Sequence, residues 1–124
     1  MNDISKQVTP FNLVLEDVGV FPNLRRPRVV WIGLKGDVDK LVNLQKDIES
    51  AMEQFGFESE NREFKPHLTL ARVKFGRGDH HWERIMQKTV VENSTPFIVS
   101  SFFLFESILK PTGAQYNKLA CFSF

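Results

Sequence analysis

A histidine and a threonine two residues apart are the side chains of this sequence best suited to chemistry. His67 and Thr69 follow Pro66, which favours an extended backbone because proline fixes its own φ and disfavours helix for the residue before it. Side chains two apart on a strand share a face, so imidazole and hydroxyl can reach one ligand. Histidine exchanges protons near neutral pH, and a hydroxyl donates to an anionic oxygen. The same pattern is also typical of two half-exposed strand residues satisfied by water, because three-residue matches are common by chance.

The neighbours of this pair predict a buried strand with a core on one side. Leu68 and Leu70 fall on the face opposite His67. Strict alternation places Arg72 on the leucine face as well, away from the imidazole. Two explanations are open: the strand ends or bulges near Ala71, which re-aims the guanidinium, or Arg72 only caps the edge of the sheet.

Apolar periodicity predicts the elements that precede this strand. Residues 11–20 alternate as in a half-buried strand, and residues 29–34 are apolar on both faces as in a central strand. Asp37 is the expected N-cap of a helix that Gly56 ends as its C′ residue. The apolar stripe of this helix consists of Val38, Leu41, Val42, Ile48, Met52 and Phe55.

The elements after this strand complete an α+β pattern. Asp79 is the expected cap of a second helix that runs to about residue 91. Residues 97–109 form a Phe-rich run interrupted at Ser100 and Ser101, and residues 116–124 are expected to pair with it through a turn longer than the tightest types. Two helices and hairpin links predict antiparallel sheets with both helices packed on the outer face.

Composition limits the function classes. A chain of 124 residues with 42% hydrophobic and 25% charged residues is expected to fold as one domain spanning 1–124. A net charge of +1 excludes strong global attraction to nucleic acid or to an anionic membrane, so an anionic ligand needs a local cluster of positive charge. The single cysteine, Cys121, favours a reducing compartment. No stretch has the roughly 20 apolar residues of a membrane span, so we expect a cytoplasmic protein without membrane contact.

Residues 64–74 closely resemble the second signature of the two-histidine (2H) phosphoesterase superfamily. The resemblance is to the 2′-5′ RNA ligase-like group, which acts as RNA 2′,3′-cyclic phosphodiesterases. Residues 18–22 and 26–33 are similar to the segment between the two signatures of that group, and residues 105–116 look like its closing hairpin. The resemblance therefore covers nearly the whole chain.

The resemblance implies a metal-independent hydrolase without a cofactor. Its substrate would be an RNA end carrying a 2′,3′-cyclic phosphate, or a related small cyclic phosphodiester, opened to a 2′-phosphate with 2′-5′ RNA ligase activity on the side. By the family pattern His67 belongs to the proton-transfer pair, Thr69 holds a non-bridging oxygen and Arg72 supplies positive charge.

Three further residues are predicted to contact substrate. Phe64 is expected to stack on a base, although core filling is the commoner use of a phenylalanine. Arg28, with Arg25 and Arg26, is expected to hold RNA phosphates, although a solvated approach to the strand explains the three arginines equally well. Tyr116, in the hairpin-like segment, is the third.

The departure from the family pattern is a missing motif. The family carries two H-x-T motifs, one on each lobe of a bilobal fold, and this sequence has one. His80 and His81 have no threonine or serine two positions on. We therefore expect a partial version of the fold that begins after the first motif, with weak or no activity alone and a homodimer through the surface so exposed. The alternatives are a non-catalytic RNA-end binding module and a self-associating family remnant.

Overall fold

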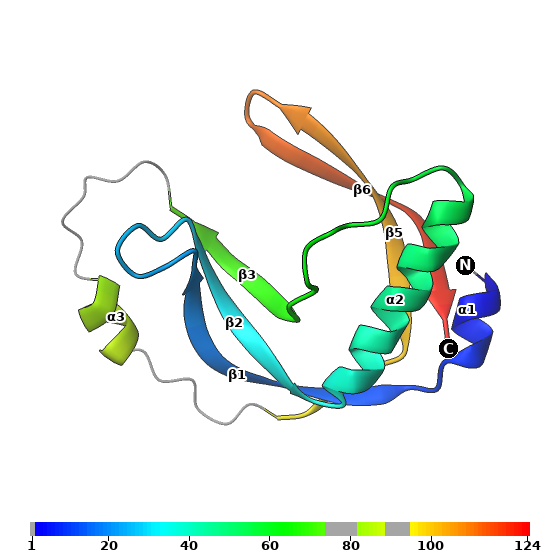
Figure 1. The fold of residues 1–124 in the computed structure, drawn as a ribbon, viewed down its shortest axis with the longest axis horizontal. Helices are drawn as coiled ribbons and strands as arrows, with labels where there is room; N and C mark the ends of the chain where they lie inside the picture. Colours follow the sequence, from blue (N-terminus) through cyan, green and yellow to red (C-terminus); the bar gives the residue numbers. More distant parts are fainter. Residues whose placement is uncertain (1, 74–81, 89–94) are drawn as a thin grey trace.

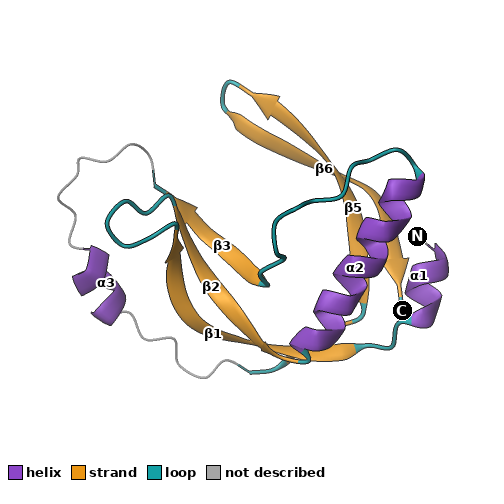
Figure 2. Cartoon of the chain, in the orientation of Figure 1, coloured by secondary structure: helices purple, strands orange, loops and turns teal. Residues whose placement is uncertain are grey.

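The computed structural model describes residues 2–73, 82–88 and 95–124 of the chain, as a four-stranded and a two-stranded antiparallel sheet with helices (Figure 1). The strand orders are β3-β2-β1-β4 and β5-β6 (Figure 2). The elements are α1 (Asn2–Gln7), β1 (Phe11–Phe21), β2 (Val29–Gly36), α2 (Val38–Gln54), β3 (His67–Arg72), α3 (Trp82–Lys88), β4 (Phe97–Val99), β5 (Ser101–Lys110) and β6 (Gly113–Ser123). The predicted α+β class is confirmed, and α1 adds a helix to the two that were predicted.

The central strand predicted at residues 29–34 is confirmed, because β2 lies between β1 and β3. The pairing of β1 with β2 is interrupted between Glu16 and Val18, so Asp17 is an extra residue in β1. Asp17 has φ 57°, a left-handed conformation that aspartate tolerates better than most residues. The bulge resets the alternation of β1 and places Gly19 opposite Trp31.

The long helix α2 begins and ends at the predicted residues, but the side chain of its N-cap residue has another partner. Gly56 has φ 91°, and the N–H of Phe57 donates to the carbonyl of Met52, which completes a Schellman motif. The prediction of Asp37 as the N-cap residue is confirmed, although its side chain forms no capping hydrogen bond with the helix. Its Oδ2 instead accepts a hydrogen bond from the Asn12 N–H at 2.9 Å and so joins α2 to β1.

The core forms where the first half of β1 meets α2, α1 and the ends of β5 and β6. Phe11 and Leu13 of β1 and Leu44 of α2 are its buried residues. Leu44 lies in the apolar stripe of α2, although the predicted stripe omitted it. Phe55, which the prediction included, is 73% exposed because it lies just beyond the end of the helix. Hydrophobic residues packed around this core are Ile4, Val8, Leu34, Val38, Leu41, Ile48, Val99, Phe102 and Phe124.

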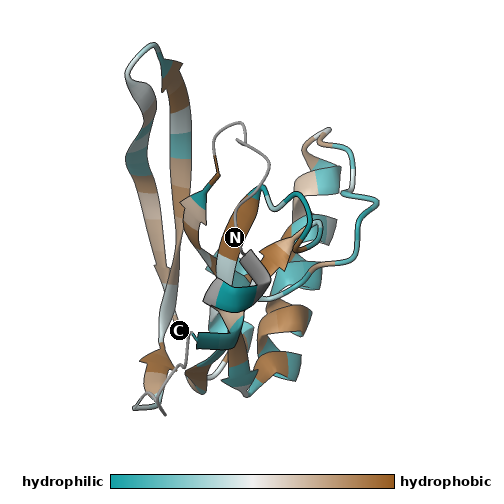
Figure 3. Cartoon of the chain, turned by 90° about the vertical axis from the view of Figure 1, so that its left-hand side faces the viewer, coloured by the Kyte–Doolittle hydropathy of each residue, from teal (hydrophilic) through white to brown (hydrophobic). Residues whose placement is uncertain are grey.

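The hairpin of β5 and β6 extends from this core, and its tip projects away from the rest of the chain in both views (Figure 1, Figure 3). Lys110 pairs with Gly113, so only Pro111 and Thr112 connect the strands, and the prediction of a longer turn is wrong. The predicted second helix corresponds to α3, whereas its expected cap, Asp79, and residues 89–91 lie outside the described residues.

Candidate functional site

His67 and Thr69 lie on β3, the strand at one edge of the four-stranded sheet. His67 pairs with Gly33 of β2 and Thr69 pairs with Trp31, so both side chains belong to one face of the sheet. The imidazole is half-buried and the threonine is exposed. The predicted shared face is therefore present.

The opposite face of β3 differs from its prediction. Leu68 is 47% exposed and Leu70 is 57% exposed, so the expectation of a buried strand with a core beneath the leucines is wrong. The reason is the position of β3: among the described strands it pairs with β2 alone and forms the edge of the sheet.

A β-bulge brings Arg72 to the same face as His67. The register of β3 on β2 shifts between Thr69 and Ala71, which leaves Leu70 as an extra residue. After the shift Arg72 pairs with Val29, two residues before Trp31 on β2. Because residues two apart on β2 share a face, Arg72 lies on the face that carries His67 and Thr69. Of the two explanations left open by the sequence, the bulge is the one found.

The hydrogen bond of His67 defines which of its nitrogens is free. Its Nδ1 lies 2.5 Å from the carbonyl oxygen of Lys65, and a carbonyl can only accept, so Nδ1 carries the proton. In the neutral ring Nε2 is then unprotonated and available to take a proton. Once protonated, the same Nε2 can give that proton away. This arrangement suits either half of an acid–base exchange.

Two aromatic residues that sequence reasoning missed lie next to the imidazole. The ring of Phe21 lies edge-on to His67 with centroids 5.4 Å apart, and that of Trp31 lies 6.4 Å away. Phe21 and Trp31 stack on one another at 5.1 Å. A glycine at position 19 in an otherwise bulky strand is the one signal in the sequence for this cluster, because it leaves room for the indole.

An acidic side chain shares a row of the sheet with His67. Glu16 of β1 and His67 of β3 both lie opposite Gly33, which has no side chain between them. The ammonium group of Lys35 pairs with the Glu16 carboxylate, and this hydrogen bond raises the pKa of Lys35 above its ordinary value. The negative charge of Glu16 is thus compensated on the face where an anionic ligand would lie.

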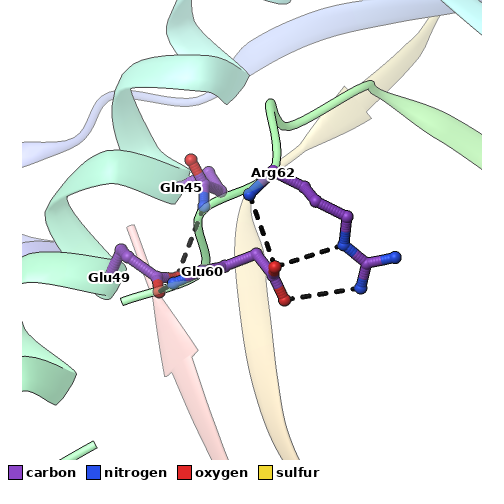
Figure 4. A network of polar contacts seen from close by, with 4 residues as sticks. All are labelled: Gln45, Glu49, Glu60 and Arg62. Carbon is purple, nitrogen blue, oxygen red and sulfur yellow. Dashed lines mark hydrogen bonds and ion pairs between the residues drawn. The ribbon is translucent and has the colours of Figure 1, made fainter. Parts of the chain in front are cut away.

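The loop that leads into β3 is tied to α2 by a polar network (Figure 4). Glu49 Oε1 accepts a hydrogen bond from the backbone N–H of Glu60 at 2.6 Å, and Glu49 Oε2 accepts one from Gln45 at 3.5 Å. Arg62 Nε donates to Glu60 Oε1 at 3.2 Å. Hydrogen bonds from Arg62 hold the pKa of Glu60 below its ordinary value. These contacts restrict the loop seven residues before His67.

The other predicted substrate contacts are not all brought to this face. Phe64 lies in the loop just before β3 and is 38% exposed. The N–H of Arg28 donates to Phe21 and its carbonyl accepts from Val73, so this exposed arginine adjoins the end of β3 that carries Arg72. Tyr116, 67% exposed, belongs to the two-stranded sheet rather than to the sheet of His67.

No group of three or more histidine, cysteine, aspartate and glutamate side chains within the described residues is arranged to hold a metal ion. None of the helices described is long and apolar enough to cross a membrane. His80 and His81 lie outside the described residues.

The model of the 2′-5′ RNA ligase superfamily matches residues 2–106. This chain belongs to the 2′-5′ RNA ligase superfamily. The resemblance predicted from residues 64–74 is therefore confirmed.

Curated relatives in the superfamily are similar over most of this chain. It is 35% identical over 109 residues to the RNA 2′,3′-cyclic phosphodiesterase of Aeropyrum pernix, and 38% identical over 113 residues to that of Archaeoglobus fulgidus. These alignments cover 88% and 91% of this chain, but only 62% of each relative.

Solved structures of similar fold also match nearly the whole of this chain but only part of their own length. TT0787 of Thermus thermophilus matches with a TM-score of 0.68 and 26% identity, over 98% of this chain and 64% of that one. Escherichia coli LigT, complexed with 3′-AMP, matches in fold with a TM-score of 0.67 and 23% identity, over 97% of this chain and 64% of LigT. The chain thus spans a little under two thirds of the length of each of these four proteins.

Proposed function

We propose that this chain carries one half of the active site of an RNA 2′,3′-cyclic phosphodiesterase, with His67, Thr69 and Arg72 as its residues. The observation that carries the proposal is the single face shared by these three side chains, with Nδ1 of His67 occupied by the Lys65 carbonyl. That arrangement offers a proton-transfer group, a hydroxyl and a positive charge to one phosphate.

The chemistry requires two proton transfers. Water attacks phosphorus and the bond to the ribose O3′ breaks, while a base takes a proton from the water and an acid gives one to O3′. The products are a 2′-phosphate and a 3′-hydroxyl. His67 performs one of these transfers through Nε2, the Thr69 hydroxyl donates to a non-bridging oxygen, and the Arg72 guanidinium stabilises the charge of the transition state. When the 5′-hydroxyl of a second RNA end attacks phosphorus in place of water, it loses its proton to the base, O3′ gains one from the acid, and the two ends are joined by a 2′-5′ bond.

A second candidate function is a non-catalytic module that binds phosphorylated RNA ends. The presence of a single H-x-T motif favours it, because a phosphate can be bound with one histidine but the reaction needs a second proton-transfer group. Loss of one member of an acid–base pair typically costs on the order of 10²–10⁴ in rate. We expect the chain alone to bind such ends with weak or no turnover.

One titration separates the two functions. An oligonucleotide ending in a 2′,3′-cyclic phosphate is added to the purified chain, and both complex formation and release of the 2′-phosphate product are followed. Turnover that His67→Gln abolishes identifies the enzyme, whereas binding without turnover that Arg72→Gln weakens identifies the module. An RNA end that neither binds nor reacts would refute both.

The arginine-bearing turn between β1 and β2 is proposed to hold the RNA chain that leads to this end. The Asn23 Oδ1 accepts hydrogen bonds from the N–H groups of Arg25 at 3.0 Å and Arg26 at 2.9 Å, so the turn is ordered. Arg25, Arg26 and Arg28 are exposed, and within the described residues none of them forms an ion pair. Such free guanidinium groups are suited to phosphates. Phe64 is proposed to stack on the base of the terminal nucleotide.

The exposed face of β5 and β6 is proposed to mediate a homodimer. Phe103, Phe105 and Leu109 share one face of the hairpin, and they are 41%, 47% and 87% exposed. An isolated two-stranded ribbon is marginally stable, so covering this face with a second copy is favourable. Each copy could then supply one His67 to a shared site. Light scattering tests the idea: a monomer at all concentrations rules it out.

Tyr116 remains a proposed substrate contact, which the loss of RNA affinity in Tyr116→Phe would support. Because Cys121 is free and exposed, we also propose that the chain works in the reducing environment of the cytoplasm.

A further inference from the structure

We propose that Phe21 and Trp31, here called the aromatic bracket, are positioning residues that hold the His67 ring with its Nδ1–H on the Lys65 carbonyl. The inference rests on the proposed function of His67 as a proton-transfer group. Neither residue belongs to the segment that carries the histidine: Phe21 ends β1 and Trp31 lies in β2.

Trp31, the first residue of the bracket, packs directly against a glycine of β1. Trp31 pairs with Gly19 of β1, and a Cβ atom at that glycine would overlap Cζ2 of the indole and lie 2.7 Å from its Cε2. The ring therefore lies directly against the backbone of β1. Its Nε1 is buried without a hydrogen-bond partner in the part of the chain that the structure describes. Packing against Gly19 and Phe21, rather than a hydrogen bond, holds the indole in place.

Phe21, the second residue of the bracket, contacts both residues that form the hydrogen bond between His67 Nδ1 and the Lys65 carbonyl. The Phe21 ring stacks on Trp31 and meets the imidazole of His67 at an interplanar angle of 89°. The ammonium group of Lys65 lies 5.6 Å from the centroid of the same ring. Phe21 thus touches the residue that donates the hydrogen bond and the residue whose carbonyl accepts it.

The orientation of the imidazole determines its chemistry. A half-turn of the ring about its bond to Cβ exchanges Nδ1 with a carbon and removes the hydrogen bond to Lys65. The neutral ring then divides between two tautomers, so the nitrogen that faces substrate is no longer in one protonation state. By packing against the imidazole, the two stacked rings of the bracket oppose this rotation. It acts through His67 and does not itself transfer a proton.

Nitrogen NMR of the histidine side chains tests the proposal without RNA. The chain is labelled with ¹⁵N-histidine, and His67→Gln identifies the His67 signals among those of the three histidines. In the neutral ring of the unmodified chain we expect one tautomer, with the proton on Nδ1. Phe21→Leu removes the contact to the ring, and Gly19→Ala displaces the indole of Trp31 without replacing any aromatic residue.

In both variants the ratio of the Nδ1–H to the Nε2–H tautomer is expected to fall about tenfold, the factor that loss of one ordinary hydrogen bond produces. Phe102→Leu is the matched control, because Phe102 stacks on Phe122 at 4.9 Å in the other sheet. It weakens packing of the same kind and is expected to leave the ratio unchanged. Amide spectra establish that each variant is folded.

A ratio that stays within twofold in folded Phe21→Leu and Gly19→Ala would overturn the proposal, as would an equal change in Phe102→Leu. Because the measurement contains no RNA, its outcome is independent of the phosphodiesterase proposal. If His67→Gln changed neither binding nor turnover of the RNA end, the result would count against the proposed function alone. If the tautomer ratio were unchanged in Phe21→Leu and Gly19→Ala, the result would count against the bracket alone.

Discussion

Replacement of the three turn arginines tests how far the proposed RNA site extends beyond His67. The variant Arg25→Gln, Arg26→Gln, Arg28→Gln removes three exposed positive charges next to the end of β3 that carries Arg72. We expect it to weaken binding of an oligonucleotide ending in a 2′,3′-cyclic phosphate. A cyclic mononucleotide, which has no further phosphates, should bind about equally to both proteins.

The size of the expected change in the salt dependence of RNA affinity follows from counterion release. Each phosphate contact on a single strand contributes about 0.7 to the slope of log affinity against log salt concentration, so three contacts contribute about 2. Raising the salt from about 50 mM to about 200 mM should therefore cost the unmodified chain about 20-fold more affinity than the variant. Binding to a labelled oligonucleotide, followed by fluorescence anisotropy across this range, measures both slopes.

A charge-matched control makes the result specific. Lys6, Lys40 and Lys46 are exposed on α1 and α2, and their replacement by glutamine lowers the net charge of +1 by the same three units. These lysines belong to helices and not to the sheet that contains β3, so the slope should remain that of the unmodified chain. An equal loss of slope in both triple variants, or no loss in the arginine variant, would refute the local phosphate contacts.

The remaining predictions concern the scaffold. Leu44→Ala should lower the free energy of unfolding by about 3 kcal/mol, because it opens a cavity in the core; urea denaturation measures this loss. Asp37→Ala should cost about 1 kcal/mol in the same assay, since the Asn12 N–H loses its acceptor. Glu60 should titrate below the ordinary range of a glutamate and return toward it in Arg62→Gln, as followed by carboxyl NMR. The small stability due to this pair is therefore present above the ordinary pKa and lost as the pH falls through the lowered one.

Local features of the chain could be predicted from sequence because they depend on neighbouring residues. The alternation of residues 11–20, the apolar run at 29–34 and the glycine that ends α2 each determine the backbone within a few positions. The shared face of His67 and Thr69 is of the same kind, since it follows from the period of a strand. The most specific part of the family resemblance, residues 64–74, contains the same short segment.

The tertiary structure decided what depends on partners distant in sequence. Whether Leu68 and Leu70 are buried depends on what covers β3, and β3 proved to be an edge strand. Alternation put Arg72 on the wrong face, and only pairing with β2 reveals that Leu70 is extra. The hairpin likewise placed Tyr116 in the other sheet.

The surroundings of the imidazole were beyond any local pattern. Phe21 and Trp31 come from two other strands, and a glycine at position 19 has no meaning until Trp31 is placed against it. A strand's period specifies which side chains share a face, but only the register between strands specifies which of them touch.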